Sequence, residues 1–189
     1  TTSDADVTIT AGQQVLIDTA IMATGDITVR TTLAPAQGDN GLGVIVGTAG
    51  GLTSVAKTTD AQGSEVLIDA VGGISVMGQI TSGGSVNSAG NVSWVEKDST
   101  LRLISDAQVY LGGMAQARDG SFAELGGTFR ASDSIFVQSG VSADGVGVRL
   151  PGSGVMVVSQ EDGRIDIVAR GNAEIFGTVV AGGDVTTYR

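Results

Sequence analysis

Apolar and polar residues alternate along much of the chain. The alternation is clearest in Val7–Ala11, Val15–Ile17, Ile27–Val29 and Ile165–Ile167. A period of two places successive side chains on opposite faces of a strand, so one face of each strand can be buried. A helix is disfavoured because Gly interrupts nearly every window and β-branched residues dominate. The pattern therefore predicts an all-β protein.

The alternation recurs in a template of about twenty residues. In the first copy the apolar positions lead into Thr24-Gly25-Asp26, and the next strand begins at Ile27, twenty residues after Val7. Further copies begin at Val66, Leu101 and Ile165. The apolar positions assigned to the core are Val7, Ile9, Val15, Ile17, Val66, Ile68, Leu101, Leu103, Ile165 and Ile167. The corner positions are Gly25, Gly84, Gly120 and Gly183, where glycine can supply a positive φ.

A twenty-residue unit of short strands cannot bury its own apolar face, whereas stacking such units in register does bury it. The repeat therefore predicts a parallel β-solenoid. A uniform period from Val7 to Val185 leaves room for about nine turns. Residues 32–64 and 122–164 depart from the template and are expected to carry longer loops. We find no linker-like segment and expect a single domain over residues 1–189.

The template resembles the haemagglutinin repeats of the filamentous-haemagglutinin family of large bacterial surface or secreted proteins. It is visible at residues 7–26 and 165–184, and its closest matches are Ala23-Thr24-Gly25-Asp26-Ile27 and Ala181-Gly182-Gly183-Asp184-Val185. The resemblance implies a right-handed parallel β-helix, an extracellular or bacterial cell-surface location, and a role in adhesion or as a stalk. It carries no catalytic residues.

Composition narrows the possible chemistry. The 189 residues include neither Cys nor His, which excludes disulfides, Cys/His zinc sites and imidazole-dependent catalytic groups. Twenty acidic residues against ten basic ones give a net charge of −10, which disfavours nucleic acid and anionic membranes as partners. No apolar stretch is long enough to span a bilayer. The few aromatic residues Trp94, Phe122, Phe129, Phe136 and Phe176 are expected to stack in the core.

Carboxylates are the only abundant acid–base groups. A pair of them could cleave a polysaccharide, and the candidates are Asp18, Asp26, Asp69, Asp106, Asp133, Asp162, Asp166 and Asp184. Acidic, Gly-rich turns could bind calcium, and the candidates are residues 37–41, Asp60 with Ser64 and Glu65, and residues 161–163. Neither the EF-hand loop nor the nonapeptide calcium repeat is present, so we expect these residues to be hydrated corners and faces, with no enzyme activity and no cofactor.

The sequence leaves three functions open. The first is a stiff β-helical shaft, whose partners are neighbouring solenoid segments and a host, partner-cell or polysaccharide surface. The second is a subunit that polymerises head to tail, suggested by the polar start at residues 1–6 and by a last strand that begins at Val185 without a cap. The third is a polysaccharide-binding or polysaccharide-cleaving module, which convergence of aromatic and acidic residues on one sheet would favour.

Overall fold

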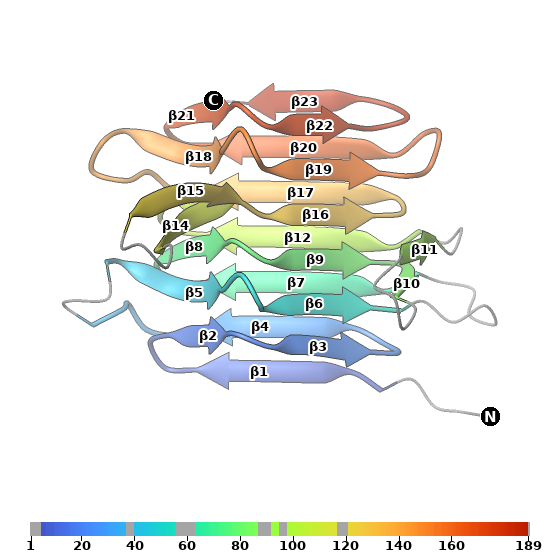
Figure 1. Cartoon of the computed structure of the whole chain (residues 1–189), viewed down its shortest axis with the longest axis horizontal. Helices are drawn as coiled ribbons and strands as arrows, with labels where there is room; N and C mark the ends of the chain where they lie inside the picture. Colours follow the sequence, from blue (N-terminus) through green and yellow to red (C-terminus); the bar gives the residue numbers. More distant parts are fainter. Residues whose placement is uncertain are drawn as a thin grey trace.

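The computed structural model describes residues 5–36, 40–55, 63–86, 92–94, 98–116 and 121–188. These residues form an all-β structure in which three parallel sheets are stacked side by side around a common interior (Figure 1). The chain visits the three sheets in turn, so neighbouring strands of one sheet are separated by strands of the other two. This strand order is that of a β-helix or solenoid, as the repeat predicts. No helix in the described residues is long and apolar enough to cross a membrane.

The strands of each sheet are parallel to their neighbours and follow one another along the stack. The long sheet has seven strands: β1 (Val7–Ala11), β4 (Ile27–Thr31), β7 (Glu65–Ala70), β12 (Thr100–Ser105), β17 (Ser134–Ser139), β20 (Arg164–Ala169) and β23 (Val185–Tyr188). The second sheet has six: β2 (Val15–Ile17), β5 (Leu42–Val46), β8 (Gly73–Val76), β13 (Val109–Tyr110), β18 (Val146–Leu150) and β21 (Asn172–Ile175). The third has six: β3 (Ala20–Ala23), β6 (Gly51–Ser54), β9 (Gln79–Ser82), β16 (Thr128–Ala131), β19 (Val155–Val158) and β22 (Thr178–Val180).

The register of the long sheet shows where the repeat is regular. Val7 pairs with Ile27, and Ile165 pairs with Val185, each a step of twenty residues. The four steps between Ile27 and Ile165 are longer, from 30 to 39 residues. A uniform twenty-residue period, on which the expectation of about nine turns rested, is therefore found only in the first and last steps. Because the middle steps contain insertions, the described long sheet has seven strands.

Some of the inserted residues form antiparallel pairs beside the stack. The strand β10 (Gly84–Val86) pairs with β11 (Val92–Trp94), and β14 (Gly112–Gln116) pairs with β15 (Phe122–Gly126). Figure 1 shows the β14–β15 hairpin at the side of the stack near β8 and β18. After each insertion the chain returns to the parallel sheets. The register of the second sheet shifts locally at two places, between Leu42 and Val44 where β5 pairs with β8 and between Val146 and Val148 where β18 pairs with β21.

The inward positions of the strands form one apolar cluster that runs through the stack. In the middle of the stack Val66, Ile68, Leu101 and Leu103 are fully buried. Toward its ends, Val15, Ile17, Ile165 and Ile167 are also buried. Val7 and Ile9 are only partly buried, because β1 has a strand neighbour on one side only.

The aromatic residues are mostly not in the core, which corrects the expectation of core stacking. Of the described phenylalanines, Phe129 is fully buried, whereas Phe122 and Phe176 are each 64% exposed. Phe136 alternates with the buried Ile135 and Val137 and therefore lies on the outer face of β17. The narrow interior is filled by Val, Ile, Leu and Ala from three sheets, which leaves little room for rings. The side chain of Trp94 lies outside the described residues.

The expected corner glycines differ from those that adopt a positive φ. Gly25 lies between β3 and β4, Gly84 lies within β10, and the Gly183 amide donates to the Gly163 carbonyl oxygen at 2.9 Å. Gly120 lies outside the described residues. Within the described ranges, the glycines with positive φ are Gly41, Gly72, Gly83 and Gly145.

The chain turns a corner just before it enters each strand of the long sheet. At several of these corners a side chain accepts a hydrogen bond from a backbone amide. The Asp26 carboxylate accepts the Glu65 amide proton at 2.8 Å. The buried Ser99 hydroxyl accepts the Ser64 amide proton at 3.0 Å, and the Ser132 hydroxyl accepts the Ser99 amide proton at 2.9 Å. These bonds join successive levels where the backbone leaves the parallel ladder, so buried amides keep their partners.

Close backbone contact disfavours any side chain at Gly78, in the corner between β8 and β9. A Cβ atom at Gly78 would lie 2.0 Å from the Gly50 carbonyl oxygen and 2.6 Å from that of Gly47. Gly78→Ala must therefore move two backbone segments, and we expect it to lower the free energy of unfolding by about 2–4 kcal/mol. Urea denaturation followed by circular dichroism measures this change.

Gly152→Ala is the matched control, because a Cβ atom there meets nothing within 4 Å. It should leave stability unchanged or raise it by up to about 1 kcal/mol through the unfolded state. Equal stabilities of the two variants would contradict the backbone contact at Gly78.

Candidate functional site

The outer face of the long sheet carries side chains in rows that cross the strands. Because the strands pair in register, Leu67, Arg102, Phe136 and Asp166 are successive partners on β7, β12, β17 and β20. A second row next to it contains Glu65, Thr100, Ser134 and Arg164. Residues separated by about thirty positions in the sequence therefore lie one strand spacing apart, about 4.8 Å.

A shallow groove lies over these rows, across β12, β17 and β20. Its volume is about 240 Å³, and it is lined by Thr100, Arg102, Ser134, Phe136, Arg164 and Asp166. We call it the Phe136 groove. A groove of this size is smaller than the pockets that hold drug-sized molecules. It can accommodate one ring or one small group of a larger ligand.

The charged groups of the Phe136 groove form two weak ion pairs. Arg102 Nη1 lies 3.5 Å from Glu65 Oε1, and Arg164 Nε lies 3.3 Å from Asp166 Oδ2. The Arg164 side chain is 68% exposed, so solvent screens its pair and the net contribution to stability is small. The Arg102 guanidinium carbon lies 5.9 Å from the centre of the Phe136 ring. The groove thus combines an aromatic ring with hydrogen-bond donors and acceptors that a ligand can reach.

A second cluster lies on the outer face of the second sheet and is centred on Arg149. Arg149 Nε lies 3.2 Å from Glu124 Oε1, and Arg149 Nη1 lies 3.4 Å from Glu174 Oε2. The Tyr110 hydroxyl donates a hydrogen bond to Glu124. The rings of Tyr110 and Phe176 both lie 5.9 Å from the Arg149 guanidinium carbon.

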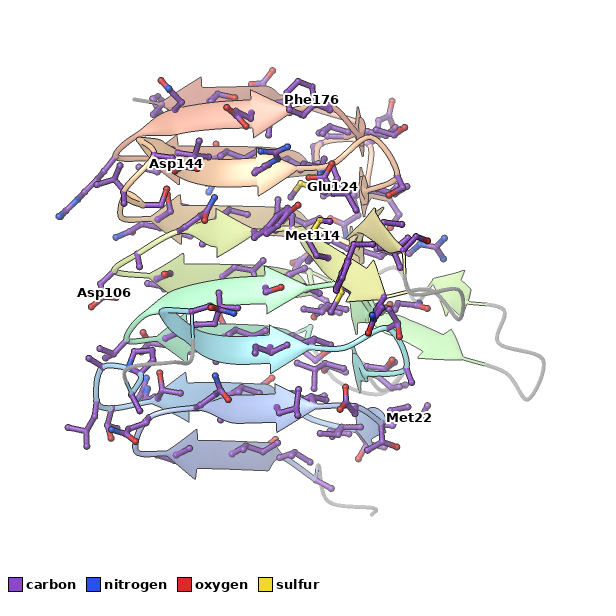
Figure 2. The ribbon with its side chains drawn as sticks, turned by 60° about the vertical axis from the view of Figure 1, so that its left-hand side comes forward. Met22, Asp106, Met114, Glu124, Asp144 and Phe176 are labelled. Atoms are coloured by element: carbon purple, nitrogen blue, oxygen red, sulfur yellow. The ribbon has the colours of Figure 1, made fainter. Side chains whose placement is uncertain are left out.

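This Arg149 cluster connects the β14–β15 hairpin to the stack. Glu124 belongs to β15, while its partners Tyr110 and Arg149 belong to β13 and β18. Figure 2 labels Glu124 and Phe176 on this side of the molecule. Since both carboxylates already contact Arg149, we interpret the cluster as a structural connection.

Of the other carboxylates considered as catalytic candidates, three bond the backbone or pair with arginine. Asp26 and Asp106 accept amide protons from Glu65 and Gly72, and Asp69 pairs with Arg30 at 3.0 Å. In the described part of the chain no three acidic side chains come together in a way that could hold a metal ion. Of the calcium candidates, residues 37–39 and Asp60 lie outside that part.

Aromatic and acidic residues therefore meet on two outer faces, Phe136 with Asp166 and Tyr110 with Glu124. Sequence reasoning assigned Asp166 to a possible site but placed Phe136 in the core and did not single out Arg102 or Arg164. The available signal was alternation: Phe136 stands between the apolar Ile135 and Val137. That the residues meet depends on steps of 34 and 30 residues, which the irregular middle of the chain does not reveal.

Comparison with known proteins gives no relative: no protein-family model, no curated protein and no solved structure matches the chain.

The Arg149 cluster predicts an unusual titration of Tyr110. Burial, followed by the hydrogen bond and the negative charge of Glu124, raises the pKa of Tyr110 from 10 to about 12. Because the folded state favours the protonated form, this stabilisation is complete below pH 10 and is lost as the pH rises from 10 through about 12.

Ultraviolet absorbance of the Tyr188→Phe variant isolates Tyr110, since the chain has two tyrosines. We expect its ionisation near pH 12, and at a lower pH once Glu124→Gln removes the charge. A midpoint near pH 10 with Glu124 intact would show that the hairpin does not make this contact in solution.

Proposed function

We propose that this chain is a structural segment: the stiff, right-handed β-helical shaft of a large extracellular or cell-surface bacterial protein of the adhesin type, without catalytic activity. The right hand is supported by the strong preference of parallel strand connections for right-handed crossovers. The proposal of an extracellular location and an adhesive role rests on the repeat residues at 7–26 and 165–184, which resemble filamentous-haemagglutinin repeats.

The continuous parallel ladder is the observation that supports a mechanical role most directly. All three sheets extend through the described stack, and one apolar cluster fills the space between them. Sharp bending or proteolytic cleavage of such a stack requires several adjacent backbone hydrogen bonds to break together. The net charge of −10 keeps neighbouring rods apart in solution.

A head-to-tail filament is the second candidate function. Among the described strands, β1 and β23 each have one neighbour in the long sheet, and the same holds for β2, β21, β3 and β22 in the other two sheets. Unpaired strand edges can add further strands. The edge strands at the two ends of the stack therefore favour end-to-end association of copies.

Electron microscopy of the purified chain, with light scattering for its mass, tests both candidates. A shaft segment should give compact particles with the mass of one chain, because six spacings of about 4.8 Å make the described stack only about 29 Å tall. Long fibres of the width of a single rod would favour the filament subunit and contradict an isolated shaft segment. Far-ultraviolet circular dichroism of the same sample completes the test: a spectrum without the β-sheet signature would overturn the β-helix and both proposals with it.

A further inference from the structure

We propose that the Phe136 groove binds a neutral pyranose unit of an oligosaccharide. This proposal concerns the outer face of the long sheet and does not depend on whether the chain serves as a shaft. It rests on three observations: an aromatic ring on an outer face, hydrogen-bond donors and acceptors on both sides of it, and a local balance of charge.

The ring of Phe136 is the apolar part of the groove. It is half-buried on β17, and its position is fixed by the buried neighbours Ile135 and Val137 and by Arg102 beside it. The C–H groups on one face of a pyranose form a flat apolar surface. Packing that surface on an aromatic ring removes both from water, which favours binding.

The polar groups around the ring suit sugar hydroxyls. The Arg164 guanidinium only donates hydrogen bonds, and the Asp166 carboxylate only accepts them. The two groups lie 3.3 Å apart at their closest atoms, so together they match adjacent hydroxyls that each donate and accept. The hydroxyls of Thr100 and Ser134, which also line the groove, can do both.

The balance of charge favours a neutral ligand over an acidic one. Arg102 and Arg164 are each paired with a carboxylate, Glu65 and Asp166. A ligand carboxylate would have to displace one of these and would also meet the repulsion of a chain of net charge −10. A neutral sugar meets neither obstacle.

The rows also suggest how a longer oligosaccharide lies. Leu67, Arg102, Phe136 and Asp166 follow one another across four strands at about 4.8 Å per strand. A pyranose unit has a similar length along an extended glycan. We therefore expect the glycan to cross the strands along the stack, with one unit on Phe136 and the next toward Asp166.

Calorimetric titration of the whole chain with a panel of neutral oligosaccharides built from hexose units tests the proposal. We expect saturable binding of at least one of them, and about tenfold weaker binding by Phe136→Ala. The matched control is Phe122→Ala, which removes a ring that is 64% exposed on the hairpin, away from the groove. It should bind as the unaltered chain does.

Arg164→Gln provides a second variant whose folding is not at risk, because its side chain is 68% exposed. It should weaken binding several-fold with an unchanged circular dichroism spectrum and melting temperature. No saturable binding of any neutral oligosaccharide, or equal binding by the Phe136→Ala and Phe122→Ala variants, would overturn the proposal. Binding confined to uronic-acid oligosaccharides and abolished by salt would also overturn it, in favour of an anion site. None of these results bears on the association state of the chain, which microscopy tests separately.

Discussion

In-register stacking of parallel strands is the constraint on which the rest of this structure depends. An inward position on one strand faces an inward position on the next, as in the buried series Val66, Leu101, Ile135 and Ile165. A slip of one residue would turn an entire strand over and expose its apolar side chains. Register is therefore held by core burial at each level, with added support from corner bonds such as that between Ser64 and Ser99.

The same constraint explains why insertions are tolerated so freely. The chain must return to the next level in register, but the length of its path is not fixed, because the entropy cost of closing a loop grows slowly with its length. Steps therefore range from 20 to 39 residues in one continuous sheet. The β14–β15 hairpin uses this freedom, and Glu124 then secures it through Arg149 and Tyr110.

In-register stacking and the variable length of the steps between strands also explain how much of the structure could be predicted from the sequence. Alternation identified the all-β class and inward residues such as Leu103 and Ile167, because burial acts at each strand separately. Spacing was ambiguous: the 59 residues from Val7 to Val66 fit three short steps, whereas the sheet contains one of 20 and one of 39. The groove could not be predicted for the same reason. Arg102 and Phe136 are neighbours across a step of 34 residues, and the sequence alone does not reveal the length of that step.

The register that aligns the core residues also aligns the side chains on the outer faces of the sheets. Unlike the core, these faces are not restricted to apolar residues. Charges there pair across strands, as Arg30 does with Asp69 and Arg149 with Glu174. Such exposed pairs contribute little to stability, so the outer residues are free to vary while the ladder beneath keeps their spacing. A β-helix of this kind can therefore hold a ring, a guanidinium and a carboxylate at fixed mutual positions without a deep pocket. Fixed spacing of this kind, at about 4.8 Å per strand, is what the proposed recognition of an extended, repeating ligand requires.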